Sequence, residues 1–94
     1  MTYRMKPVIK QAFQYDGDFM NSSGEYYAPY WVVEALFFGK IRFADNGVLF
    51  VQTSEGNMKV EVGDYIVKGI EGELYPVKAS VFEKTYELLK GVGE

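Results

Sequence analysis

The side chains in this sequence that could carry out acid–base or metal chemistry are carboxylates, because the chain contains no histidine and no cysteine. Glu71 and Glu73 lie two residues apart, Asp64 precedes them, and Glu83 and Glu87 are spaced by four. Paired carboxylates can hydrolyse glycosides or hold Mg²⁺ or Ca²⁺. Turn formation, helix capping and solvation are simpler roles for most of them. We therefore expect no catalytic residue, no metal and no other cofactor, and a carboxylate- or metal-dependent enzyme is the last of the alternatives.

Missing residue types exclude further classes of enzyme. Without histidine and cysteine, Ser-His-Asp catalysis, Cys-His catalysis and the usual zinc sites are ruled out. Neither of the glycine-rich phosphate-binding patterns, GxxxxGK[ST] and GxGxxG, occurs in the chain.

Glu73 is the carboxylate with the best case for a specific role, because it follows a hairpin turn. There it could pair with Lys68 or Lys78 across the strands.

Aromatic side chains offer binding chemistry instead. The chain has eight tyrosines, and four aromatic residues gather between positions 26 and 31. Tyrosine and tryptophan are enriched in binding surfaces because they combine a large rigid area with one polar group, and their rings can stack on bases. Packing in and around the core is the alternative role. The candidate binding residues are Tyr26, Tyr27, Tyr30, Trp31, Arg42, Glu73 and Tyr75.

The helix that should position most of these aromatics spans residues 28–38. Pro29 can occupy its first turn, where a missing N–H costs nothing, and Gly39 is suited to end it. Trp31, Ala35 and Phe38 fall on one stripe. A helix this apolar should be mostly buried or should pack against a second copy of the chain.

The rest of the chain predicts strands and one more helix. Residues 7–15 read as a strand, residues 41–44 and 48–53 flank the hairpin signal Asn46-Gly47, and Met58, Val60 and Val62 alternate with polar residues. A second hairpin joins residues 65–68 to 74–78, where Pro76 requires an edge strand or a bulge. We therefore predict a single α+β domain over residues 1–94. It would have a small curled antiparallel sheet or partial barrel, a meander of about five to six strands, with one central helix and one C-terminal helix.

A capping box marks the start of the C-terminal helix. Ser80 and Glu83 have the S-x-x-E spacing, so Ser80 is predicted to be the N-cap. The apolar residues that follow recur at helical spacing, with Phe82 as the expected core contact, and Gly91 and Gly93 should end the helix.

The same region carries a family resemblance. The run GDYIVKGIEGELYPVK at 63–78, together with FEKTYE at 82–87, resembles a pattern in short proteins of phages and prophages and in bacterial domains grouped as PGDYG proteins. The opening KPVI at 6–9 is similar to the start of the same prophage proteins. Val62 and Ile66 depart from the PGDYG motif, which has proline and glycine at those positions. The resemblance implies a bacterial or phage protein of the cytoplasm and implies no activity. The matching positions are Gly63, Asp64, Tyr65, Gly69, Gly72, Glu73, Tyr75, Pro76, Phe82, Tyr86 and Glu87.

Composition narrows the location and the partners. The net charge of −3 argues against broad nucleic-acid binding. No apolar run approaches the roughly 18 residues of a membrane span, and the first ten residues lack a signal-peptide core. We expect a cytoplasmic protein of a bacterial host cell that has no membrane partner.

Together these observations predict a non-enzymatic binding module. It would bind a host protein or itself, as a homo-oligomer, through the helix at 28–38 and the neighbouring tyrosines. The alternative is a small-molecule binder, in which aromatic rings and Arg4 or Arg42 hold a nucleotide-like ligand and sequester a host metabolite or signal.

Overall fold

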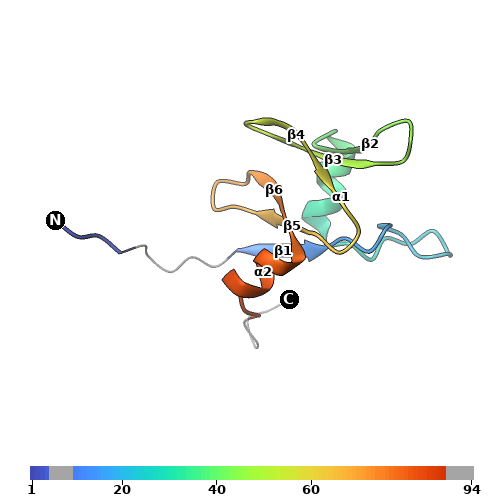
Figure 1. The fold of residues 1–94 in the computed structure, drawn as a ribbon. Helices are drawn as coiled ribbons and strands as arrows, with labels where there is room; N and C mark the ends of the chain where they lie inside the picture. The colour runs from blue at the N-terminus through green and yellow to red at the C-terminus, as the bar shows by residue number, and fades with distance from the viewer. Residues whose placement is uncertain (5–9, 89–94) are drawn as a thin grey trace.

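The computed structural model describes residues 1–4 and 10–88, and it confirms an α+β fold with antiparallel strands and two helices (Figure 1). Among these residues, no helix has the length and apolar character needed to cross a bilayer. The elements in chain order are β1 (Gln11–Gln14), α1 (Tyr30–Phe37), β2 (Ile41–Phe43), β3 (Leu49–Thr53), β4 (Gly56–Val60), β5 (Tyr65–Lys68), β6 (Leu74–Val77) and α2 (Ala79–Thr85).

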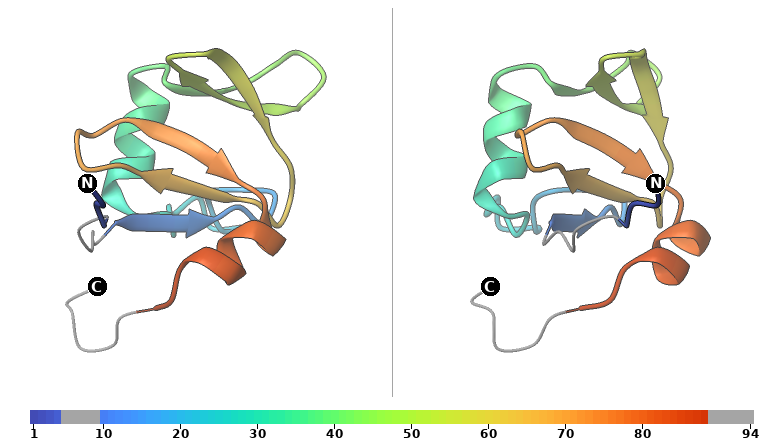
Figure 2. Two further views of the ribbon diagram at one scale, coloured as in Figure 1. Left: turned by 60° about the vertical axis from the view of Figure 1, so that its left-hand side comes forward. Right: turned by 90° about the vertical axis from the view of Figure 1, so that its left-hand side faces the viewer.

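The strands are divided between two three-stranded antiparallel sheets. The first has the order β1-β5-β6 and the second the order β2-β3-β4, so the second is a simple meander. The β5–β6 hairpin lies between α1 and the second sheet on one side and β1 and α2 on the other (Figure 2). The predicted strand at 7–15 corresponds to β1, and positions 7–9 fall outside the described residues.

Pro76 lies on β6, which is an edge strand as predicted. It is opposite Ile66 of β5. Gly69 donates its N–H to the carbonyl of Glu73 at 2.8 Å, so these two residues form a hydrogen-bonded pair. From this pair, hydrogen-bonded and non-hydrogen-bonded pairs of residues alternate along the hairpin. In that alternation Pro76 occupies a position whose N–H would point away from β5, so the missing donor costs the sheet nothing. Gly72 has a φ of +84°, which confirms that this turn requires a glycine.

The helix α1 begins after Pro29 and ends at the predicted glycine. Gly39 has a φ of +78°, and its N–H donates to Leu36 while that of Lys40 donates to Ala35. This pair of bonds is the Schellman arrangement, which satisfies carbonyls at the end of the helix. Phe38, which the sequence places on one stripe with Trp31 and Ala35, is 73% exposed, whereas Ala35 is buried.

The core lies between α1 and the inner faces of both sheets. It contains residues from α1, from the loop before it and from the strands β2, β3, β4, β5 and β6: Tyr15, Phe19, Ala28, Val32, Ala35, Ile41, Leu49, Val51, Val60, Ile66 and Leu74. On β4 the predicted alternation is only partly right, because Val60 is buried while Met58, and Val62 just beyond the strand, are exposed.

The helix α2 differs from the prediction at its start and in its burial. Its N-cap is Lys78, which makes no side-chain capping bond, so Ser80 is already inside the helix and the predicted capping box is wrong. No residue of α2 is buried. Phe82 is therefore not a core residue but is half-buried, with its ring stacked on Tyr65 at a centroid distance of 3.7 Å. The predicted terminal glycines, Gly91 and Gly93, lie outside the described residues.

Candidate functional site

The outer side of α1 carries the most exposed aromatic surface in the described part of the chain. At 3.6 residues per turn, this side faces away from the buried residues Val32 and Ala35. It runs along one side of the molecule, with the sheets on the other side of the helix (Figure 2). We call the following residues the aromatic face: Tyr26, Tyr30, Phe37 and Phe38.

Exposure separates the members of the predicted aromatic cluster. Tyr30 and Phe37 are 78% and 75% exposed. Tyr26 meets the edge of Phe37, with the ring centroids 6.4 Å apart, and this contact joins the preceding loop to the helix. Trp31 instead packs against the core. Phe37 and Phe38 were not among the candidate residues, although two successive aromatics on a helix point about 100° apart and cannot both face the core.

Tyr27 has a structural contact rather than a place on the aromatic face. Its hydroxyl donates to the carboxylate of Asp16 at 2.6 Å. This hydrogen bond to Asp16, together with partial desolvation, raises the pKa of Tyr27 to about 12. The bond fastens the loop before α1 to the end of β1, and so helps to hold the aromatic face in place.

Glu34 lies within the aromatic face and carries the only charge on α1. It is one helical turn from both Tyr30 and Phe38, and it is exposed. A ligand that covers the face must therefore compensate one carboxylate in the middle of an apolar surface.

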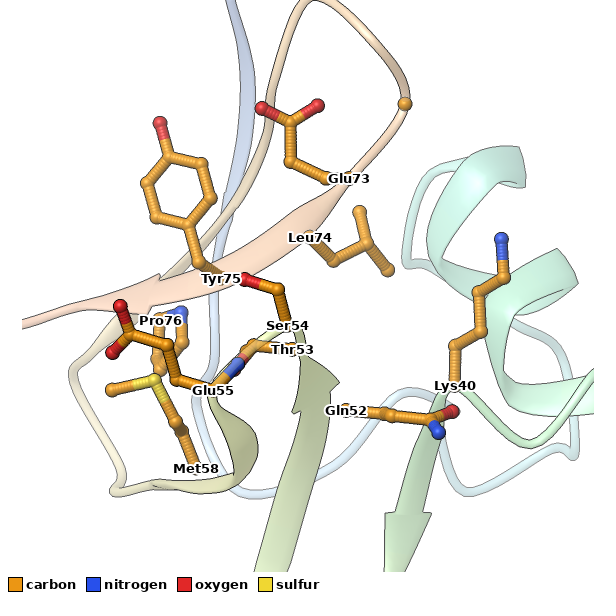
Figure 3. Close-up of a pocket in the computed structure, with 11 residues that line it drawn as sticks. Lys40, Gln52, Thr53, Ser54, Glu55, Met58, Glu73, Leu74, Tyr75 and Pro76 are labelled. Carbon is orange, nitrogen blue, oxygen red and sulfur yellow. The ribbon is translucent and has the colours of Figure 1, made fainter.

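A separate groove runs between β6 and the turn that joins β3 to β4 (Figure 3). It has a volume of about 520 Å³, and its lining includes Lys40, Ser54, Glu55, Glu73, Leu74 and Tyr75. A second hollow, of about 280 Å³, adjoins it through Lys40, Gly72 and Leu74 and brings in Trp31. Of the predicted site residues, Glu73 and Tyr75 therefore line the groove, and Trp31 lines the adjoining hollow.

The other predicted residues are not brought into the groove. Tyr26, Tyr27 and Tyr30 belong to the α1 side, and Arg42 is exposed on β2 opposite Phe50. The lysine that lines the groove is Lys40, which lies just beyond Gly39 at the end of α1.

Glu73 makes a local contact and not the predicted ion pair. Its carboxylate accepts the N–H of Glu71 at 3.0 Å and lies against Gly69, where an added Cβ would collide with it. Lys78 instead approaches the buried Asp64, at 3.9 Å between Nζ and Oδ2. Within residues 1–4 and 10–88, no group of three or more acidic side chains is placed to hold a metal ion.

A third arrangement joins Lys10, Tyr75 and Tyr86, which no sequence pattern indicates because Lys10 is 65 and 76 positions from the two tyrosines. The Lys10 Nζ donates to the Tyr75 hydroxyl at 2.8 Å and to the Tyr86 hydroxyl at 3.4 Å. The two hydroxyls are themselves 3.4 Å apart. We call these residues the Lys–Tyr cluster.

Three comparisons with known proteins give no relative for this chain. No family model matches the sequence. No curated protein matches it. No solved structure matches the fold. The resemblance to phage and prophage proteins therefore stays a prediction from the residues of 63–87.

Proposed function

We propose that this protein is a non-enzymatic interaction module of phage or prophage type that binds a host protein in the bacterial cytoplasm through the aromatic face of α1. The observation that carries the proposal is the exposure of Tyr30, Phe37 and Phe38 on one side of one helix. Removing such apolar area from water supplies affinity. Clustered exposed aromatics are also typical of protein contact sites.

The charge on the aromatic face defines the chemistry of the partner. Glu34 loses water when the face is covered, so the partner should present a lysine or arginine among apolar side chains. Self-association is less well supported. Glu34 is near the middle of α1, so two copies of the helix packed antiparallel would bring their Glu34 carboxylates together.

A crosslinking experiment can identify the partner. A photoreactive phenylalanine analogue at position 37 should capture a specific host protein in bacterial cells, whereas the same analogue at Val62 should not. Val62 is a suitable control because it is similarly exposed but lies between β4 and β5, at the end of β5 opposite the β5–β6 turn.

The affinity for the purified partner then tests the site itself. Phe37→Ser should weaken binding by about 30-fold, the equivalent of ~2 kcal/mol for a central aromatic contact. Glu34→Lys should weaken it further at low salt, and reversing the partner's matching cation should restore it. Val62→Ser should bind like the parent. Unchanged binding by both α1 variants would show that the aromatic face is not the binding site.

Native mass spectrometry distinguishes a host partner from a second copy of the chain. We expect the purified protein to be a monomer. A dimer that disappears in Phe37→Ser would assign the aromatic face to self-association instead.

A small-molecule binder is the second candidate function, and the groove beside β6 favours it. Its volume of about 520 Å³ is within the range of ligand pockets, about 300–1,000 Å³. Tyr75 offers a ring at one side, and Lys40 offers a cation for a phosphate at the other.

A thermal-shift screen tests this second candidate. A nucleotide that occupies the groove should raise the melting temperature of the parent and of Lys59→Met, but not that of Lys40→Met. Lys59 is the matched control because it is an exposed lysine on β4 that does not line the groove. The absence of a shift across a broad nucleotide panel would exclude the idea.

A further inference from the structure

The Lys–Tyr cluster joins three separate elements at one point. Lys10 immediately precedes β1, Tyr75 lies on β6, and Tyr86 is the C-cap residue of α2. Figure 3 shows the hydroxyl of Tyr75 directed away from Gln52 and Met58, so the hydroxyl lies on the side of Tyr75 away from those groove residues. The ammonium group also lies over both rings, at 5.4 Å from the Tyr75 centroid and 5.7 Å from the Tyr86 centroid.

The cluster contains more hydrogen-bond donors than acceptors. An ammonium group has three donor hydrogens, and each phenol has one. The Lys10 ammonium uses two of its hydrogens on the two hydroxyls. Whichever hydroxyl donates to the other, one hydroxyl hydrogen is left over. One N–H and one O–H thus have no acceptor among the described residues, and Lys10 is exposed to solvent.

The two phenols differ in their electrostatics: burial raises the pKa of Tyr75, so its hydroxyl keeps its proton, whereas the surroundings of Tyr86 favour a negatively charged oxygen. Hydrogen bonds from Tyr75 and Lys10 hold the pKa of Tyr86 below its usual value, despite an opposing effect of burial. Hydrogen bonds to Tyr75 and Tyr86 raise the pKa of Lys10, so its positive charge is retained. An anionic oxygen at this point therefore meets donors that are already oriented.

We infer that the Lys–Tyr cluster is a binding site for an oxyanion with at least two acceptor oxygens, of the phosphoryl or carboxylate class. The anion accepts the remaining N–H of Lys10 and the remaining phenolic O–H. Because Lys10 precedes β1, Tyr75 lies on β6 and Tyr86 caps α2, an anion bound to the cluster also ties the end of α2 to the first sheet.

The test is an NMR titration of the full chain with inorganic phosphate, with the ionic strength held constant by sodium chloride. Saturable shifts should appear at Lys10, Tyr75 and Tyr86. In Lys10→Met, which keeps an apolar stem of similar length, phosphate should bind at least about tenfold more weakly, as for the loss of one charge-assisted bond. Lys59→Met, which removes an exposed lysine on β4 outside both the groove and the Lys–Tyr cluster, should bind like the parent.

The double variant Tyr75→Phe/Tyr86→Phe retains both rings and therefore the packing of α2. It should also weaken phosphate binding, since no phenolic O–H remains in the cluster. A parallel titration with acetate separates the two anion classes: tighter phosphate assigns a phosphoryl group, and tighter acetate assigns a carboxylate. Equal responses to phosphate and to chloride alone, or parent-like phosphate binding by both Lys10→Met and Tyr75→Phe/Tyr86→Phe, would overturn the inference.

Discussion

The helices α1 and α2 are both short and both carry aromatic residues, but different interactions hold them to the sheets. Val32 and Ala35 anchor α1 in the buried cluster. No residue of α2 is buried, and it contacts the first sheet through a stack of rings, in which Phe82 lies between Tyr65 and Tyr86, and through the hydrogen bonds of Tyr86 in the Lys–Tyr cluster. Figure 2 shows the same difference, with α1 alongside the sheets and α2 on the outside of the first sheet.

Exposed aromatic residues therefore have different roles in the two helices. On α1 the inner side already secures the helix, so the rings on the outer side are available to a partner. On α2 the rings are engaged in holding the helix itself. Aromatic content alone does not distinguish these roles. They are distinguished by whether the side of the helix that faces the sheets contains buried residues, as it does in α1 but not in α2.

A matched pair of substitutions tests the difference most directly. Val32 of α1 is fully buried, whereas Val81 of α2 is 53% exposed. Val32→Ala should lower the free energy of unfolding by about 2 kcal/mol, from lost burial and the cavity left behind. Val81→Ala should change it by less than about 0.5 kcal/mol. Urea denaturation measures both, and equal costs would contradict the distinction.

Phe82→Ala tests whether ring stacking is what holds α2. The expected cost is about 1–2 kcal/mol, below the roughly 3–5 kcal/mol of a fully buried phenylalanine. Amide exchange should show α2 opening before the sheets. Phe82→Tyr keeps the ring, and since Phe82 is half-buried the added hydroxyl can reach water, so this variant should resemble the parent. Loss of the whole fold in Phe82→Ala would mean that α2 belongs to the core.

The ends of the two helices also differ. Gly39 ends α1 at a φ of +78°, whereas Tyr86 ends α2 at a φ of −121°. Gly39→Ala should cost about 1 kcal/mol, and the cause is backbone strain alone because an added Cβ meets nothing within 4 Å. Gly39→Asn should recover part of this loss, since asparagine tolerates the left-handed conformation. Thermal unfolding of the two variants measures the difference.

Local chemistry made much of the fold predictable. A glycine at position 72 between two β-rich runs indicates a hairpin, and the structure has that hairpin with the glycine at positive φ. Pro76 indicated an edge strand, and Gly39 indicated the end of α1; both are confirmed. Each of these signals depends on the conformational limits of a single residue, which do not depend on the rest of the molecule.

The parts that could not be predicted depend on tertiary placement. Periodicity identified α1 and aligned Phe38 with Trp31 and Ala35, but it did not show that Phe38 is exposed, because a stripe predicts which residues align and not which of them meet the core. The pairing of β1 with β5, 51 to 57 residues apart in their registered pairs, has no local signal. The same is true of the Lys–Tyr cluster, since no sequence pattern brings Lys10 to Tyr75 and Tyr86.

Ser80→Ala gives the smallest expected effect and tests the start of α2. The S-x-x-E spacing predicts a cap, but the N-cap is Lys78 and Ser80 is the second residue of the helix. Alanine is a better helix former than serine, so the substitution should be neutral or stabilise by up to about 0.5 kcal/mol. Asn21→Ala is the control that loses a real side-chain-to-backbone contact. The Asn21 Oδ1 accepts the N–H groups of Ser23 and Glu25 at 2.9 and 3.0 Å, and their loss should cost about 1 kcal/mol. A comparable loss in Ser80→Ala would place the start of α2 at Ser80 and restore the capping box.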